Sequence, residues 1–126
     1  MKIKSVAGLT CHVKNLSKTA KFYKSLGFVI RKQDATHLTV YSNWFWIDFL
    51  PISRETRPEF KKEARLNSKG AGVFMYLSVD DVDAFHRELL SKGIKASSKP
   101  ADQPWGNREF ILRDPDGYKL VIFKRK

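Results

Sequence analysis

Two polar residues, His12 and Asp48, stand in strand-like segments, and both side chains can transfer protons. His12 fits either a general base or a structural histidine, because a catalytic base also requires a partner within hydrogen-bonding reach. Asp48 requires a partner wherever it is buried, since an unpaired buried charge is costly. That partner is a ligand cation, Arg108 or a nearby backbone donor. The candidate catalytic residues are therefore His12 and Asp48, while His37 is expected to be structural and His86 to be solvated.

Other kinds of catalysis find no support. Cys11 alternates with the polar residues of its strand, which predicts a small buried apolar side chain rather than a nucleophile. One cysteine excludes the usual zinc spacing, and Gly70-Ala71-Gly72 is too short for a phosphate-binding loop. A lone cysteine also excludes an internal disulfide, and the first residues have no signal-like apolar segment. We therefore expect a cytoplasmic protein without a membrane span.

The elements that position these residues follow from local patterns. Apolar residues at 16, 20, 23 and 26 have helical spacing, with Asn15 or Ser17 as the cap and Gly27 as the stop. Strands are predicted at residues 5–13, 28–31, 37–41 and 45–50, with a tight turn at Ser42-Asn43. A second helix begins after Asp81 and ends at Gly93. Further strands are predicted at residues 72–79, 94–97, 108–113 and 118–123, with a turn at residues 114–117.

The two halves align at an offset of 66 residues, which indicates an internal duplication. Val13 matches Val79, Asn15 matches Asp81, and Gly27 matches Gly93. A chain of 126 residues has room for one domain, residues 1–126. Within it we predict βαβββ modules at residues 5–50 and 72–124. The connector, residues 51–71, has a short helix near residues 58–65, and a solvated linker is favoured over a binding patch or a lid.

Three sequence motifs resemble those of the glyoxalase, bleomycin-resistance and dioxygenase superfamily, also called vicinal oxygen chelate proteins. They are His12-Val13-Lys14-Asn15-Leu16 with Phe22-Tyr23-x-x-Leu26-Gly27-Phe28; Val79-Asp80-Asp81-Val82; and Pro104-Trp105-Gly106-x-Arg108-Glu109-Phe110 with Asp114-Pro115-Asp116-Gly117. The resemblance implies an α+β fold in which two βαβββ modules form curled mixed sheets around a cavity. It also implies a homodimer.

Most enzymes of that superfamily hold a divalent metal with His, Glu or Gln side chains from four strands. The resemblance places those ligand positions at Gly8, Asp48, Phe74 and Val121, and only Asp48 can ligate. No cofactor or metal site is therefore predicted, and a divalent metal is the less favoured alternative.

Strand alternation, combined with the resemblance, indicates which residues line the cavity. Trp105 and Arg108 lie on the segment that resembles the family's binding-site loop. The expected ligand-binding residues are Trp44, Trp46, Asp48, Phe74, Tyr76, Trp105, Arg108 and Phe123. Aromatic walls favour planar rings or cations. Aromatic residues at this spacing are also common in plain cores.

The leading interpretation is a metal-free protein that binds and sequesters a small molecule, as bleomycin-resistance proteins do. The formal net charge of +11 favours a planar ligand that is neutral or anionic. The alternative is an enzyme, either metal-dependent through Asp48 or an acid–base lyase or isomerase using His12 or Asp48. A nucleic-acid-binding module that uses the connector and the Lys124-Arg125-Lys126 tail is a weaker alternative, because the basic residues are spread along the chain and no known motif occurs.

Overall fold

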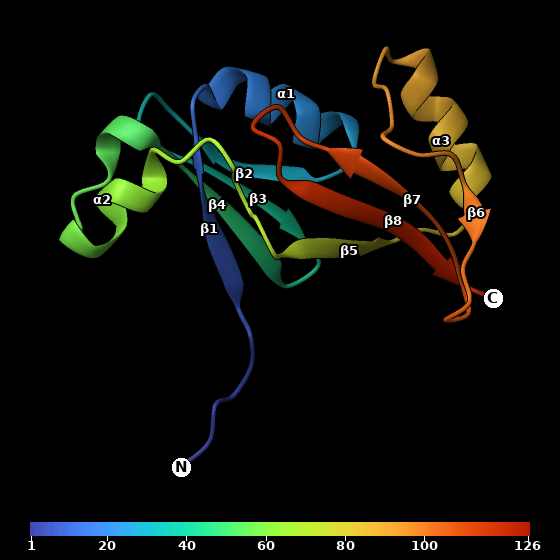
Figure 1. The fold of residues 1–126 in the computed structure, drawn as a ribbon. Coiled ribbons are helices and arrows are strands. Elements are labelled where there is room, and N and C mark those ends of the chain that lie inside the picture. The colour runs from blue at the N-terminus through green and yellow to red at the C-terminus, as the bar shows by residue number, and fades with distance from the viewer. The chain divides into compact units, whose positions relative to one another are not determined.

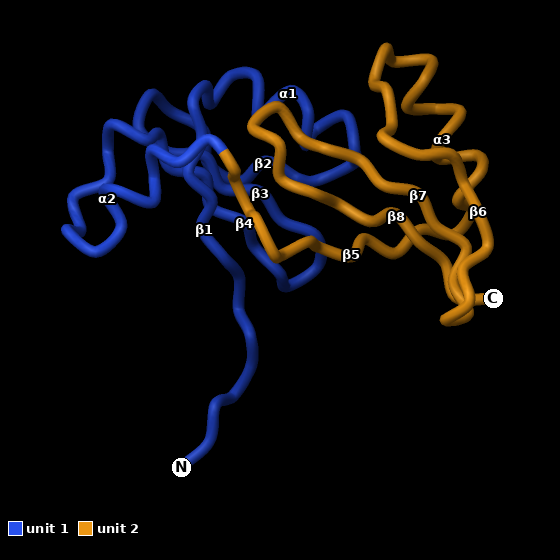
Figure 2. Tube along the Cα trace, viewed as in Figure 1, with its two compact units in different colours: residues 1–67 blue, residues 68–126 orange.

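The two halves of the chain repeat one order of elements in a computed structural model that describes residues 1–126 (Figure 1). The first half contains β1 (Gly8–Val13), α1 (Leu16–Ser25), β2 (Val29–Gln33), β3 (Leu38–Ser42) and β4 (Phe45–Pro51). The second contains β5 (Phe74–Ser78), α3 (Val82–Ser91), β6 (Ala101–Asp102), β7 (Asn107–Arg113) and β8 (Lys119–Arg125). The predicted α+β fold of two βαβββ modules is confirmed. The chain divides into two compact units, Met1–Asn67 and Ser68–Lys126 (Figure 2).

Each unit has one four-stranded mixed sheet with the same topology. The strand orders are β1-β4-β3-β2 and β5-β8-β7-β6. In both sheets the first and last strands of the unit pair in parallel, and the remaining neighbours are antiparallel. A parallel pair requires a long crossover connection, which the helix and the two intervening strands supply.

The helices begin and end at equivalent residues. Asn15 caps α1 by accepting a 3.0 Å hydrogen bond from the Lys18 amide, and Asp81 caps α3 by accepting one from Ala84 at 3.0 Å. Gly27 and Gly93 follow the two helices with φ values of 100° and 77°, in the left-handed region that favours glycine. The offset of 66 residues predicted from the sequence therefore holds for both ends of the helices.

Each helix covers one face of its own sheet. In the first unit, Tyr23 of α1 packs on Phe49 of β4 with ring centroids 4.7 Å apart. In the second unit, His86 of α3 meets Phe110 of β7 edge-on at 5.0 Å, so His86 is packed rather than merely solvated. The large apolar side chains that are fully buried in the two helix–sheet cores are Val13, Tyr23, Leu38, Val40, Ile47, Phe49, Leu89, Phe110, Leu112, Leu120 and Ile122.

The strand predicted at residues 94–97 is not formed. The fourth strand of the second sheet is instead the two-residue β6, next to Pro100, which has no amide hydrogen to donate. The neighbouring edge of β7 is bonded differently: the Ile111 amide donates to the Ser98 hydroxyl at 2.8 Å, and the Ser97 amide donates to the Ile111 carbonyl at 2.8 Å. The Ser98 hydroxyl thus accepts a backbone hydrogen bond that a neighbouring strand would accept in a regular ladder.

The segment between the sheets is more ordered than a solvated linker. A 3₁₀ turn, η1 (Ile52–Arg54), follows β4, and α2 (Pro58–Ala64) confirms the predicted short helix. Glu55 and Ala64 are buried. Most other residues of this segment are exposed, as a solvated linker would be, so these buried side chains are local exceptions. No helix in the structure has the length and apolar character needed to cross a membrane.

Candidate functional site

The sheet face of the second unit opposite α3 carries three rows of side chains set by strand register. The first row runs from Ser78 through Phe123 and Glu109 to Ala101, and the second from Tyr76 through Val121 to Ile111. The third runs from Phe74 through Lys119 to Arg113. Residues two apart on a strand share a face, so these rows form one surface.

A pocket of about 450 Å³ lies on this surface. Its lining residues are Phe74, Tyr76, Ser98, Lys99, Ala101, Gln103, Trp105, Glu109, Phe110, Ile111, Lys119 and Val121. Three of the aromatic side chains predicted from the sequence are among them. The volume falls within the range of sites that hold small organic molecules.

The aromatic side chains of this pocket are half exposed. Phe74 is 49% exposed, Tyr76 46% and Trp105 56%. The rings of Phe74 and Tyr76 are 5.6 Å apart, and Phe123, in the neighbouring row, contacts Tyr76 edge-on at 5.3 Å. Phe123 therefore contacts the wall of the pocket without lining it. These three residues are therefore not part of the buried core of the second unit, and exposed rings are available for stacking.

Glu109 is a site residue that the sequence interpretation missed. Its side chain is part of the pocket wall although the residue is only 7% exposed. One oxygen, Oε2, accepts from Trp105 Nε1 and from Asn107 Nδ2, each at 3.4 Å. Strand alternation contained the signal, because Glu109 and Ile111 lie on the face opposite Phe110 and Leu112.

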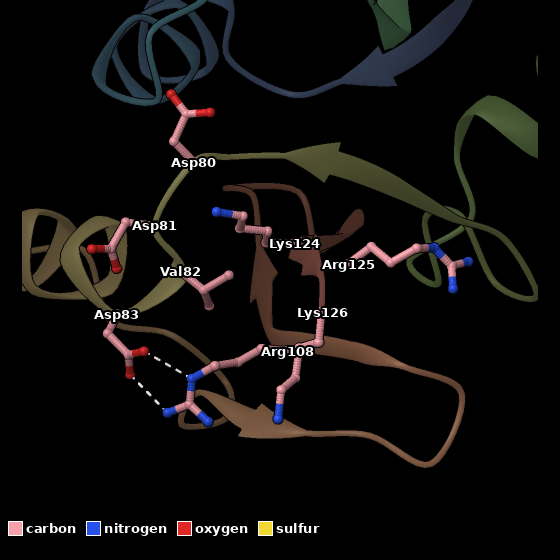
Figure 3. Close-up of a pocket in the computed structure, with 8 residues that line it drawn as sticks. All are labelled: Asp80, Asp81, Val82, Asp83, Arg108, Lys124, Arg125 and Lys126. Carbon is pink, nitrogen blue, oxygen red and sulfur yellow. Dashed lines mark hydrogen bonds and ion pairs between the residues drawn. The ribbon is translucent and has the colours of Figure 1, made fainter.

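Arg108 lies on the other face of β7, away from the aromatic pocket. Its guanidinium donates from Nε and Nη2 to the two oxygens of Asp83, both at 2.8 Å, and from Nη1 to Asp102 at 3.1 Å. Figure 3 shows this bidentate pair at the start of α3. Asp83 and Asp102 raise the pKa of Arg108, and Arg108 lowers that of Asp83. The structure therefore does not place Arg108 with Phe74, Tyr76 and Trp105.

The surroundings of Arg108 form a second, charged pocket of about 400 Å³ (Figure 3). It is lined by Asp80, Asp81, Val82, Asp83, Arg108, Lys124, Arg125 and Lys126. Lys126 Nζ donates to Asp102 at 2.7 Å and is the first cause of the lowered pKa of that carboxyl group, followed by Arg108. Several charges of this pocket thus neutralise one another within the fold.

In the first unit, Trp46 packs directly against Gly8. The two residues pair in register, and a Cβ atom added to Gly8 would lie 2.3 Å from Trp46 Cδ2. Trp44 is 74% exposed in the hairpin turn, where Asn43 has a φ of 55°. Trp44 is a turn residue outside the strand that carries Trp46, because Ser42 pairs with Phe45. The predicted turn at Ser42-Asn43 is thus one residue too early.

His12 is bound to the segment that follows β4. Its Nε2 atom lies 2.8 Å from Glu55 Oε1, and the Glu55 side chain is 1% exposed. Arg57 donates to the same carboxylate from Nη2 at 2.7 Å and from Nε at 2.9 Å. Arg57 first, and His12 second, hold the pKa of Glu55 well below its usual range. The three side chains fasten this segment onto β1.

Asp48 also has partners from its own unit. Thr39 Oγ1 donates to Asp48 Oδ1 at 2.8 Å, and His37 Nε2 forms an ion pair with the same oxygen. Neither residue was among the partners expected from the sequence. Register explains the first contact, since Thr39 is directly opposite Asp48 in the β3–β4 ladder. His12 and Asp48 therefore belong to two separate networks.

The four positions where the resemblance places metal ligands do not fit a metal ion. Phe74 and Val121 offer no donor atom, and Trp46 fills the space in which a side chain at Gly8 would project. Asp48 shares its oxygen with Thr39 and His37. No group of three or more His, Cys, Asp or Glu side chains is arranged to hold a metal.

Comparisons with known proteins agree with this architecture. The family model described as Glyoxalase/Bleomycin resistance protein/Dioxygenase superfamily matches residues 5–122. The uncharacterized protein YraH of Bacillus subtilis (strain 168) is 33% identical over 118 residues, covering 89% of this chain and 91% of YraH. A bleomycin resistance protein of Klebsiella pneumoniae is 26% identical over 120 residues, covering 90% and 86%.

Among solved structures, a bleomycin-binding protein complexed with bleomycin superposes with a TM-score of 0.65 at 25% identity. The match covers 98% of this chain and 100% of that protein. Both the sequence and the fold thus match over nearly their whole length. The chain belongs to the glyoxalase/bleomycin resistance protein/dioxygenase superfamily.

Proposed function

We propose that this protein binds a planar organic molecule, neutral or anionic, in the aromatic pocket of its second unit and holds it unchanged. The observation that carries the proposal is the pocket of about 450 Å³ in which Phe74, Tyr76 and Trp105 present half-exposed rings. Such pockets combine an apolar lining with a few polar groups that orient the ligand.

The energetic case rests on the exposed rings. Each ring leaves about half of its surface in water, and covering apolar surface stabilises a complex by roughly 25 cal/mol per Å² before the costs of association. An offset-stacked or edge-on aromatic pair contributes about 0.5–1.5 kcal/mol more. A flat ligand gains both contributions at once, which favours planar molecules.

The charges favour a neutral or anionic ligand. Lys119 lies on the pocket with its Nζ atom 5.8 Å from the centre of the Phe74 ring, and Lys99 is at the rim. The chain as a whole carries a formal net charge of +11, which attracts anions at long range. Two cations beside a stacking surface suit an aromatic acid.

The relatives point to binding of the same general kind. One homologue is a bleomycin resistance protein, and one structural neighbour is a bleomycin-binding protein solved with bleomycin. Bleomycin itself is a cationic drug and fits the charge of this chain less well than an aromatic acid does. We therefore propose sequestration as the shared function and a different ligand class.

A second candidate function is acid–base catalysis at His12. Its contact with the buried Glu55 carboxylate resembles the way a carboxylate orients a catalytic histidine. The contacts of Arg57 argue against catalysis, because Arg57 donates two hydrogen bonds to the same carboxylate. His12, Glu55 and Arg57 thus already form a structural cluster.

Calorimetric titration with two planar probes tests the proposal. 2-Naphthoate, an anion, should bind with a stoichiometry of one per pocket and more tightly than the cation N-methylquinolinium. Trp105→Ala should weaken 2-naphthoate binding about tenfold, because a stacking surface is lost. Trp44→Ala is the matched control, since Trp44 is exposed in the first unit, and it should bind like the wild type.

Two results would contradict the proposal. Absence of saturable heat with either probe would remove the aromatic pocket as a binding site. Conversion of a bound compound, detected by chromatography and lost in His12→Gln, would instead establish the enzyme.

A further inference from the structure

Glu109 is a buried carboxylate in the wall of the aromatic pocket, and the fold leaves it poorly satisfied. The residue is only 7% exposed. Its two hydrogen bonds, from Trp105 Nε1 and Asn107 Nδ2, both reach Oε2 and both measure 3.4 Å. Charge-assisted bonds are normally about 2.7–2.9 Å long. The other oxygen, Oε1, has no hydrogen bond within the protein and is accessible to solvent, since Asn107 Oδ1 is the one fully buried side-chain atom without a partner.

The neighbours of Glu109 supply no further donor. Across the ladder it is flanked by Phe123 on one side and Ala101 on the other, and the next residue on its face is Ile111. The lysines of the pocket, Lys99 and Lys119, form no ion pair with it. A ligand that covers this carboxylate must therefore supply its own donor, because a charge taken out of water without a partner is costly.

The same stretch of β7 has a second unsatisfied acceptor. Asn107 Oδ1 is buried without a hydrogen-bond partner, while the Nδ2 of the same amide turns toward Glu109. This orientation brings the only available amide donor of Asn107 to the carboxylate, at the long distance of 3.4 Å. Glu109 Oε1 and Asn107 Oδ1 are thus two acceptors of this strand that no donor of the protein reaches.

We infer that Glu109 is the polar recognition residue of this pocket, and that its ligand carries an N–H or O–H group that donates to Oε1. The inference rests on the proposed function and narrows the ligand class. The ligand is a planar aromatic compound with an amino, hydroxyl or ring N–H donor. An acidic group on the same molecule is accommodated by Lys99 and Lys119.

The inferred role differs from that of the stacking residues. The rings accept any flat molecule of suitable size, whereas a site built to receive a hydrogen bond rejects analogues that lack the donor. Glu109 is therefore a specificity-determining residue.

Paired probes that differ by one donor test the inference. 2-Naphthoate and 6-amino-2-naphthoate have the same ring system and the same carboxylate. Wild-type protein should bind the amino compound at least about tenfold more tightly, as expected for a hydrogen bond to a charged group. Glu109→Gln, which keeps the shape but loses the charge, should reduce this preference to about threefold or less. Glu88→Gln, an exposed change on α3 of the same unit, should keep the full preference.

The outcomes separate the inference from the function on which it rests. Failure of both probes to bind the wild type would overturn the proposed function and the inference with it. Equal binding of both probes to the wild type would overturn the inference alone, and this comparison needs no variant to fold. A preference that persists unchanged in a Glu109→Gln protein with native near-ultraviolet circular dichroism would also overturn it.

Discussion

Replacing Gly8 by alanine should destabilise the first unit, because Trp46 occupies the space that the new methyl group requires. The added Cβ would lie 2.3 Å from both Trp46 Cδ2 and the Trp46 carbonyl oxygen, and 2.6 Å from Cε3. Ordinary contacts between carbon atoms are about 3.5–4.0 Å, so the tryptophan must retreat by more than about 1 Å.

The ladder between β1 and β4 limits that retreat. Gly8 pairs with Trp46 in register, and the Trp46 amide donates to the Ala7 carbonyl at 3.3 Å. Since one of the close atoms belongs to the backbone, a new side-chain rotamer does not relieve the whole clash. Overpacking of this kind costs about 1–3 kcal/mol, and we expect the upper part of that range. For a chain of this size the melting temperature should fall by about 10 °C.

Urea unfolding followed by circular dichroism measures the loss, and near-ultraviolet spectra report the surroundings of Trp46. Thr10→Ala is the control, because Thr10 is exposed on the same face of the same strand, and it should cost less than about 1 kcal/mol. A Gly8→Ala protein as stable as the Thr10→Ala control would refute the packing of Trp46 on Gly8. It would also remove the steric argument that residue 8, one of the family's metal-ligand positions, has no room for a ligating side chain.

Three further predictions concern charge, binding and assembly. The pKa of Glu55 is lowered first by Arg57 and then by His12, so its ionised form stabilises the fold above the pKa of an unfolded glutamate, about 4.3. This stabilisation is lost as the pH falls toward the lowered pKa of Glu55 in the folded protein. The urea midpoint of the wild type should therefore drop more between about pH 5 and pH 2 than that of Glu55→Gln. Arg108→Ala should leave the calorimetric affinity for 2-naphthoate unchanged within about twofold, since Arg108 pairs with Asp83 and does not line the aromatic pocket. A loss as large as that of Trp105→Ala would contradict this placement. Light scattering should give a homodimer with twice the 14.6 kDa mass of the chain, and a single-chain mass would contradict the expected assembly.

The sequence contained enough information to predict the repeated architecture. Caps and stops are local signals, and Asn15 with Gly27 and Asp81 with Gly93 bounded both helices correctly. Alternation of side chains along strands is equally local. It separated Ile47 and Phe49, which are fully buried, from Trp46 and Asp48 on the opposite face. The family resemblance added that the sheets of the two modules are mixed.

The errors concern contacts that depend on register or on distant segments. Trp44 follows the alternation of β4, but the pairing of Ser42 with Phe45 makes it a turn residue. The partner of His12 is Glu55, which is 43 residues away in a segment whose charges suggested solvation. Arg108 was predicted to bind the ligand because it lies in a family-like motif. The face of β7 that it shares with Phe110 instead packs under α3. Glu109, one residue later, faces the pocket.

The two units show how one topology can serve two purposes. In the first unit, part of the face opposite α1 is filled by its own side chains: Trp46 covers Gly8, while His37 and Thr39 satisfy Asp48. A second hollow of about 560 Å³ lies beside Val29, Arg31 and Tyr41. In the second unit the equivalent face keeps Phe74 and Tyr76 exposed and leaves Glu109 Oε1 without a donor.

Phe74 stands at the position that corresponds to Gly8 under the offset of 66 residues. In the first unit, absence of a side chain at this position lets a ring from the neighbouring strand fill the surface. In the second unit, Phe74 faces Lys119 on that neighbouring strand; the Lys119 Nζ atom lies over the ring at 5.8 Å, and Phe74 is still 49% exposed. At this position the first unit thus has a tryptophan packed on glycine, whereas the second unit has an exposed phenylalanine ring beside a lysine. Because neither arrangement introduces a metal donor, the divergence of the two halves favours binding by stacking over chelation.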